Sequence, residues 1–177
     1  IKDTEIKYLR NSLKRVFSNY QHYKGIVGEH VFAFYYHHMV QDLLWNHGPK
    51  GRSSAEPGID FVTFTGDKDT KDSIKVTVWE TKTTENTVSS RANQIYDFCS
   101  ENGSLEENID SEIYAITDLF LNEPETPLKQ VVSELFLMYI NKHSNFCIGA
   151  SAVSSDLKTT ENTFNNFADC FKDELSK

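Results

Sequence analysis

The chain has 177 residues and a mass of 20.3 kDa, of which 38% are hydrophobic and 25% charged. This length and composition predict one soluble globular domain with a core large enough to stand alone. No apolar run approaches the ~20 residues that a membrane-spanning helix needs, so we expect no membrane partner. The three cysteines lie far apart and form no CxxC pair, which indicates a reducing, cytoplasmic location.

Charge is distributed unevenly along the chain. The net charge is −8, but residues 1–100 balance at +1 and residues 101–177 at −9. An acidic surface repels DNA, so we expect the second half to face solvent or a protein partner. Binding of nucleic acid by the chain alone should be weak and strongly salt-dependent.

The first hundred residues predict helices followed by a hairpin. Residues 4–23 have apolar side chains at helical spacing and a basic outer face, and Gly25 should interrupt this helix. A second, well-buried helix is predicted over about 28–45, and breakers with basic residues predict a loop over 46–54. Two strands are then expected over 59–65 and 74–83, joined by the charged turn 66–72.

The rest of the chain is mainly helical. Helices are predicted over 89–99, 109–121, 128–142 and 164–175, with a polar linker over 100–108 and a buried strand over 146–153. The order of elements is therefore α-α-β-β-α-α-α-β-α. It predicts an α/β fold, with a mixed central β-sheet flanked by helices.

Three residues of the hairpin form the main functional pattern. Asp60 opens the first strand, in Pro57-Gly58-Ile59-Asp60, and Glu80 and Lys82 lie two apart on the second. Side chains alternate across a strand, so Glu80 and Lys82 project from the same face. Two carboxylates and an ammonium group brought together by a hairpin suit a hard divalent cation and a phosphodiester.

Hydrolysis of a phosphodiester requires positive charge and an activated water, and Mg²⁺ (or Mn²⁺) supplies both. Asp60 and Glu80 are the candidate direct ligands, with the main-chain carbonyl of Thr81 as a third. Lys82 would orient or help deprotonate the attacking water, or neutralise charge in the transition state. Taken singly, Asp60 could cap a turn and Glu80-Thr81-Lys82 could be a solvated salt bridge; the combination favours the metal site.

Further residues are weaker candidates. Glu29 on the second helix could complete the metal shell, bind a second ion or act through water; alternatively it is an acid favoured by the helix dipole. Lys50 and Arg52, with His47, could clamp phosphate, although a solvated charged loop is the simpler interpretation. Gln94 could contact the DNA backbone or brace Lys82, and a structural role is the alternative.

The pattern resembles the PD-(D/E)xK nuclease superfamily, which has the restriction-endonuclease-like fold. The matching residues are Pro57, Asp60, Glu80 and Lys82, plus Glu29, and Gly58-Ile59 separates the proline from the aspartate. The resemblance covers about residues 27–100 and implies a restriction-endonuclease-like core in a single domain, with a helical and strand extension over about 109–177. It also implies a metal-dependent deoxyribonuclease.

More loosely, the chain is similar to the nuclease subunits of Hachiman anti-phage defence systems. The similarity adds Gly28 and Gly149-Ala150 to the residues above. It implies an antiviral effector subunit that a helicase (ATPase) partner holds inactive until DNA engages the complex. The alternatives are a catalytically inactive binding or assembly module with a nuclease fold, and a stand-alone restriction-type endonuclease.

Overall fold

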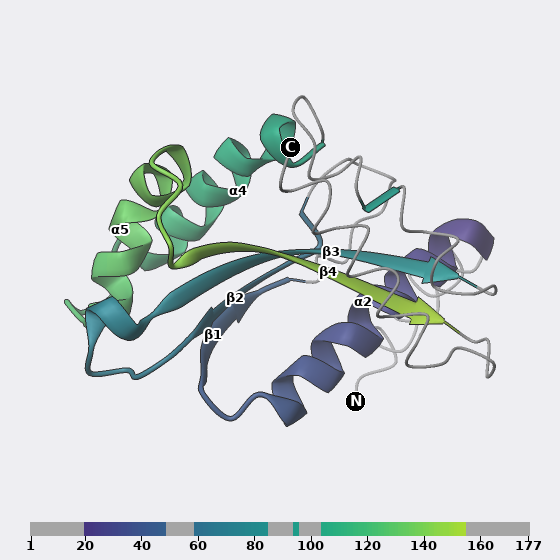
Figure 1. The fold of residues 1–177 in the computed structure, drawn as a ribbon, viewed down its shortest axis with the longest axis horizontal. Helices are drawn as coiled ribbons and strands as arrows, with labels where there is room; N and C mark the ends of the chain where they lie inside the picture. The colour runs from purple at the N-terminus through teal and green to yellow at the C-terminus, as the bar shows by residue number, and fades with distance from the viewer. Residues whose placement is uncertain (1–19, 49–58, 85–93, 96–103, 155–177) are drawn as a thin grey trace, which may run out of the picture.

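The computed structural model describes residues 20–48, 59–84, 94–95 and 104–154, and within them a mixed four-stranded sheet lies between helices (Figure 1). The predicted α/β class is therefore confirmed. The sheet has the order β1-β2-β3-β4, with β1–β2 and β2–β3 antiparallel and β3–β4 parallel. The elements are α2 (Tyr20–Met39), β1 (Leu43–His47), β2 (Phe61–Thr65), the 3₁₀ turn η1 (Lys71–Ser73), β3 (Lys75–Thr84), α4 (Ser104–Phe120), α5 (Pro127–Ile140) and β4 (Phe146–Ser154).

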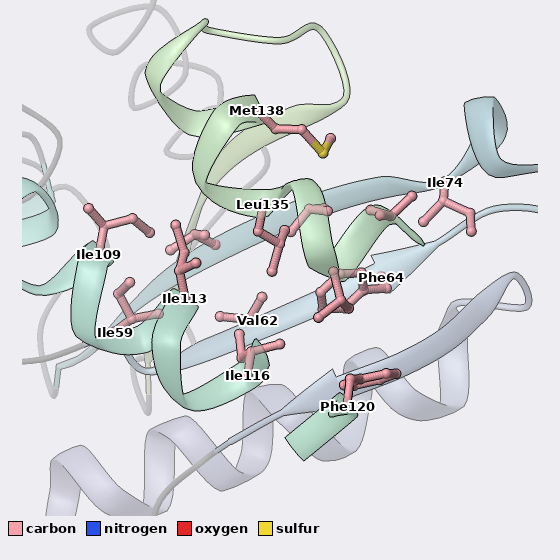
Figure 2. Close-up of a cluster of buried hydrophobic side chains, with 14 of the residues drawn as sticks. Ile59, Val62, Phe64, Ile74, Ile109, Ile113, Ile116, Phe120, Leu135 and Met138 are labelled. Atoms are coloured by element: carbon pink, nitrogen blue, oxygen red, sulfur yellow. The ribbon is translucent and has the colours of Figure 1, made fainter. Parts of the chain in front are cut away.

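Helices α4 and α5 cover one face of the sheet, and α2 covers the other (Figure 1). The main hydrophobic core lies under α4 and α5, as Figure 2 shows. Alternation along β2 and β3 directs every second side chain into this core. Its fully buried members from the sheet are Val62, Phe64, Val76 and Val78.

An aromatic cluster fills the space between α2 and the sheet. Trp79 of β3 contacts the rings of Phe32 and Tyr36 at centroid distances of 5.0 and 5.2 Å. Its indole Nε1–H donates a hydrogen bond of 3.0 Å to Oγ1 of Thr63, which satisfies the one polar group of the ring. The residues of β3 at odd positions therefore face α2, and those at even positions face α4 and α5.

The predicted hairpin is confirmed as β2 and β3. Gly66 has a φ of +137°, which glycine adopts without steric cost, and the charged turn continues into η1. Lys71 in this turn pairs with Glu134 of α5 at 2.6 Å, so the hairpin is tied to the helical layer above it.

Three predictions about the N-terminal helices are wrong. The second helix is not well buried, because Val31, Phe34 and Tyr35 of α2 are exposed. Gly25 does not interrupt a helix, because α2 runs without a break from Tyr20 to Met39. The helix also ends before the predicted limit of residue 45, and Leu43 to His47 form β1 rather than the end of a helix and the start of a loop. Only Gln41 and Asp42 separate the apolar residues of the helix from those of the strand, and no glycine or proline marks the change from helix to strand.

The predicted linker over 100–108 is wrong for its last five residues, since α4 begins at Ser104. Helix α5 and strand β4 agree with their predicted ranges within a few residues, but β4 is half-buried rather than buried. Thr126 caps α5 by accepting a hydrogen bond from the backbone N–H of Lys129, and Pro127 occupies the first turn. The predicted helices over 4–19 and 164–175 lie outside the described residues, as does most of 89–99.

None of the described helices is long and apolar enough to span a membrane.

Candidate functional site

The hairpin register brings Asp60 next to Glu80. Phe61 is paired with Trp79, so one further step of the same antiparallel register sets Asp60 opposite Glu80. Oδ2 of Asp60 accepts a hydrogen bond of 2.8 Å from the backbone N–H of Thr81. This bond fixes the Asp60 carboxylate against β3, at the point where the strand carries its charged residues.

Lys82 completes the group predicted from the sequence. Its Nζ donates a hydrogen bond to Oε1 of Glu80, as their spacing on one strand face allows. The Lys82 side chain is 31% exposed, whereas that of Glu80 is 6% exposed. The structure therefore brings the two acids and the lysine together, with Lys82 more exposed than Glu80.

Burial, and after it the negative charge of Asp60, raises the pKa of Glu80 from its ordinary value of 4.5 to about 7. The Lys82 ammonium acts in the opposite direction but is outweighed. A carboxyl group with this pKa gains and loses its proton near neutral pH. Such a perturbed acid is typical of catalytic and ligand-binding sites.

One carboxylate oxygen of Glu80 lacks a hydrogen bond among the described residues. Oε2 of Glu80 is buried and receives no hydrogen bond from any described residue. A buried carboxylate oxygen beside a second carboxylate favours either a proton or a cation between them. The donor set therefore suits a hard cation, since both side chains offer only oxygen.

Glu29 comes from a different element than these three residues. It lies in the middle of α2, whose Gly28 packs against Thr83, on the face of β3 opposite to Glu80. The described residues contain no cluster of three or more His, Cys, Asp or Glu side chains that could hold a metal ion. The interpretation of Glu29 as a first-turn acid is wrong, and its role at the site stays a prediction.

The predicted DNA-contacting residues are only partly described. Lys50 and Arg52 lie outside the described residues, as does Pro57. Gln94 is helical and exposed, next to the fully buried Ile95. Its contact with DNA stays a prediction.

Sequence reasoning missed a second ionisable pair on the same sheet face. Glu112 of α4 is only 3% exposed, and its Oε1 lies 3.4 Å from Nε2 of His47 at the end of β1. A signal was present in the sequence, because Glu112 falls at helical spacing within the apolar stripe Ile109, Ile113 and Ile116. An acid inside such a stripe requires a buried partner.

Comparison of the chain with protein-family models, with curated proteins and with solved structures finds no match.

Proposed function

We propose that this chain is a Mg²⁺-dependent nuclease that hydrolyses DNA phosphodiester bonds on a restriction-endonuclease-like core. The observation that carries the proposal is the contact group of Asp60, Glu80 and Lys82, in which a buried acid has a pKa of about 7. A solvated salt bridge would leave Glu80 exposed and its pKa near the ordinary value. The burial of Glu80 beside a like charge therefore favours a binding site over a surface ion pair.

The donor atoms fit Mg²⁺. Asp60 and Glu80 offer carboxylate oxygens, and the main-chain carbonyl of Thr81 is a third candidate ligand. Mg²⁺ in enzymes is commonly held by one or two carboxylates and keeps several waters, so a third acid is not required. Bound there, the ion would neutralise phosphate charge and lower the pKa of a coordinated water.

The protein's own side chains have separable roles in the reaction. Lys82 is the half-buried cation of the group, and its role would be to orient the attacking water and to stabilise the negative charge that develops on phosphate. Asp60, anchored by the Thr81 N–H, fixes the position of the acidic pair. Glu80 links the two, because it contacts Lys82 through Oε1 and lies beside Asp60.

The proposal extends to an effector subunit of an anti-phage defence complex, controlled by a helicase partner. The chain is acidic overall, and exposed acids lie along the outer side of α4: Glu106, Asp110 and Asp118. A surface of this charge lowers the affinity for DNA, and a second protein that recruits the chain to DNA would compensate for this. The partner would restrain the nuclease, and the isolated chain would therefore cut.

The test is cleavage of supercoiled plasmid by the purified chain with Mg²⁺ or Mn²⁺. Glu80→Gln and Lys82→Met should each lower the rate by about 10²-fold or more, because each removes one of the groups that stabilise or activate the reacting atoms. Lys75→Met is the matched control, since Lys75 is an exposed lysine of the same strand. The proposal is wrong if the double variant Glu80→Ala, Lys82→Ala cuts as fast as the wild type.

Calorimetric titration with Mn²⁺ separates the enzyme from a non-catalytic module of the same fold. A nuclease should bind the ion in the wild type and lose binding in Asp60→Asn and Glu80→Gln. Binding that does not depend on these two acids, together with no cleavage, would favour the assembly module.

A further inference from the structure

The feature outside the group of Asp60, Glu80 and Lys82 that calls for an explanation is Glu112, an acid on the buried face of α4. It is 3% exposed and lies among isoleucines that pack on the sheet. A carboxylate in such a position destabilises a protein by several kcal/mol unless a charged or hydrogen-bonding partner compensates. One such partner is His47 of β1, whose Nε2 lies 3.4 Å from Oε1 of Glu112 in an ion-pair contact; this buried nitrogen makes no hydrogen bond to a described residue.

The sheet register places His47 beside the candidate site. His47 is paired with Val62 on β2, and Val62 is paired with Val78 on β3. Paired residues of antiparallel strands project from the same face, so His47 shares the face of Glu80. Asp60 lies two residues from Val62 and is therefore a diagonal neighbour of His47, at about 7–8 Å between Cα atoms.

His47 and Lys82 lie at opposite ends of the acidic pair. On this face of β3 the side chains follow one another as Val78, Glu80 and Lys82. His47 is level with Val78, because both are paired with Val62. Asp60 and Glu80 lie one step further along this face, and Lys82 lies one step beyond them. The imidazole is stacked on Trp45 at a centroid distance of 5.8 Å, and its side chain keeps 19% exposure.

An in-line phosphoryl displacement needs groups at two opposite positions. The attacking water and the leaving oxygen lie on opposite sides of phosphorus, and both benefit from a proton-transferring or hydrogen-bonding residue. Lys82 is at one side of the acidic pair, as the reaction requires for the water. His47 is at the other side.

We propose that His47 donates its proton to the leaving oxygen of the phosphodiester, and that Glu112 is the positioning residue that orients the imidazole. The inference rests on the proposed nuclease function. In the step, the water oxygen forms a bond to phosphorus as the bond from phosphorus to the leaving oxygen breaks. The water releases one proton to solvent, the leaving oxygen takes one from His47, and His47 recovers a proton from solvent. Among the described residues, the charged groups that face the imidazole are Glu112 of α4 and, along the sheet, Asp60 and Glu80.

The experiment replaces the leaving oxygen by sulfur. The main cut made by the wild-type full chain in a DNA duplex is mapped, and the product end groups show which bridging atom leaves. A second duplex then carries sulfur at that bridging position, because a thiolate departs without a proton. With Mg²⁺, His47→Gln should lower kcat by about 10²-fold or more on the oxygen substrate and by less than about 5-fold on the sulfur substrate.

Glu112→Gln should show the same selective loss in weaker form, about 10-fold on oxygen and little on sulfur, because the imidazole remains but is held less firmly. His37→Gln is the matched control, since His37 is exposed on α2, which covers the opposite face of the sheet. Thermal unfolding of each variant shows whether it is folded. If His47→Gln does not fold, the comparison of the two substrates with Glu112→Gln decides the test.

Three outcomes overturn the inference. Equal losses on both substrates would show that the pair is structural, and wild-type rates on both would show that His47 is dispensable. Absence of cleavage by the wild type, or cleavage that Glu80→Ala leaves unchanged, would reject the proposed function and this inference with it. A selective loss on oxygen, with Glu80→Ala inactive on both substrates, supports both.

Discussion

At the scale of single residues, the protonation of Glu80 links the candidate site to stability. Burial beside Asp60 raises its pKa from 4.5 to about 7, so the folded protein holds this proton more tightly than the unfolded chain does. Below pH 4.5 both states carry the proton. Between pH 4.5 and 7 only the folded state keeps it, and stability falls as the pH rises, until both states are ionised above pH 7.

We therefore predict that the metal-free protein loses roughly 3 kcal/mol of stability from this group between about pH 4.5 and pH 8. Urea unfolding at several pH values measures the loss. Glu80→Gln should flatten the profile by about this amount, because an amide does not ionise. An unchanged profile in the variant would contradict the raised pKa.

If the proposed metal site is correct, divalent ions should have the opposite effect on the same unfolding curves. At pH 8, millimolar Mg²⁺ or Mn²⁺ should recover stability in the wild type, since an ion that binds only the folded state stabilises it. Glu80→Gln and Asp60→Asn should show no recovery. The same gain in the variants would assign the ion to another place on the protein.

Much of this site could be predicted at the residue scale, because two of its properties are local. Alternation on β3 puts Glu80 and Lys82 on one face, and a short hairpin brings Asp60 to them. The contact of Glu112 with His47 could not be predicted, because it joins α4 to β1 and depends on how a helix packs across the sheet. The position of Glu29 depends in the same way on which face α2 covers.

At the scale of elements, α2 is held close to the sheet by a glycine. A Cβ added to Gly28 would lie 1.7 Å from Oγ1 of Thr83, so any larger side chain would force the helix away from β3. That hydroxyl is itself buried without a hydrogen-bond partner among the described residues. Close packing therefore outweighs both the low helix propensity of glycine and the unsatisfied hydroxyl.

We predict that Gly28→Ala destabilises the protein by about 1–3 kcal/mol through overpacking. Adding Thr83→Ala should recover part of this loss, because it removes both the clashing atom and an unsatisfied polar group. Chemical denaturation of the single and double variants measures the coupling. Additive effects of the two substitutions would contradict the predicted clash.

Gly25 is the matched control in the same helix. A Cβ there would meet only Oε1 of Glu29, at 4.0 Å, so Gly25→Ala should stabilise by about 0.5–1 kcal/mol through helix propensity. The two glycines look alike in the sequence, and Gly25 was predicted to interrupt the helix. Only the packing of α2 on β3 distinguishes them.

The elements that sequence patterns predicted well are those with a clear period or clear punctuation. The hairpin has strands on both sides of a charged turn, and α5 follows a capping threonine and a proline. Strand β1 was missed because only Gln41 and Asp42 separate it from the helix, without a glycine or proline to mark the boundary. The start of α4 was missed because Ser104 to Asn108 are mostly polar, although this is the composition favoured in a first turn.

At the scale of the whole molecule, helices α4 and α5 from the acidic half cover the sheet face that carries the candidate site. Figure 2 shows Ile109 and Ile113 of α4 close to Ile59, the residue before Asp60. Glu106 and Asp110 are exposed on this part of the helix. Their negative field already raises the pKa of Tyr139, after the larger effect of burial.

We predict that Glu106→Gln with Asp110→Asn tightens DNA binding, on the order of 3- to 10-fold at low salt, because two charges that repel phosphate are removed near the site. Fluorescence anisotropy with a DNA duplex measures the affinity, in a Glu80→Gln background that prevents cutting. The gain should shrink as salt is raised, since exposed charges are screened.

Asp118→Asn with Glu123→Gln is the charge-matched control. These acids lie at the other end of α4 and just beyond it, where Phe120 packs against Trp45. Their neutralisation changes the net charge equally but should alter affinity less. Equal gains from both pairs would show that DNA responds only to total charge and is not bound over the first half of α4.

The parallel pairing of β4 with β3 has a consequence for how the protein is made. Glu80 is in register with Ala150, and the hydroxyls of Thr81 and Ser151, which are 70 positions apart, share a hydrogen bond of 2.8 Å. A ribosome releases Glu80 and Lys82 long before it releases the strand that flanks them. The nascent polypeptide therefore cannot complete the environment of these two residues until translation has passed residue 154.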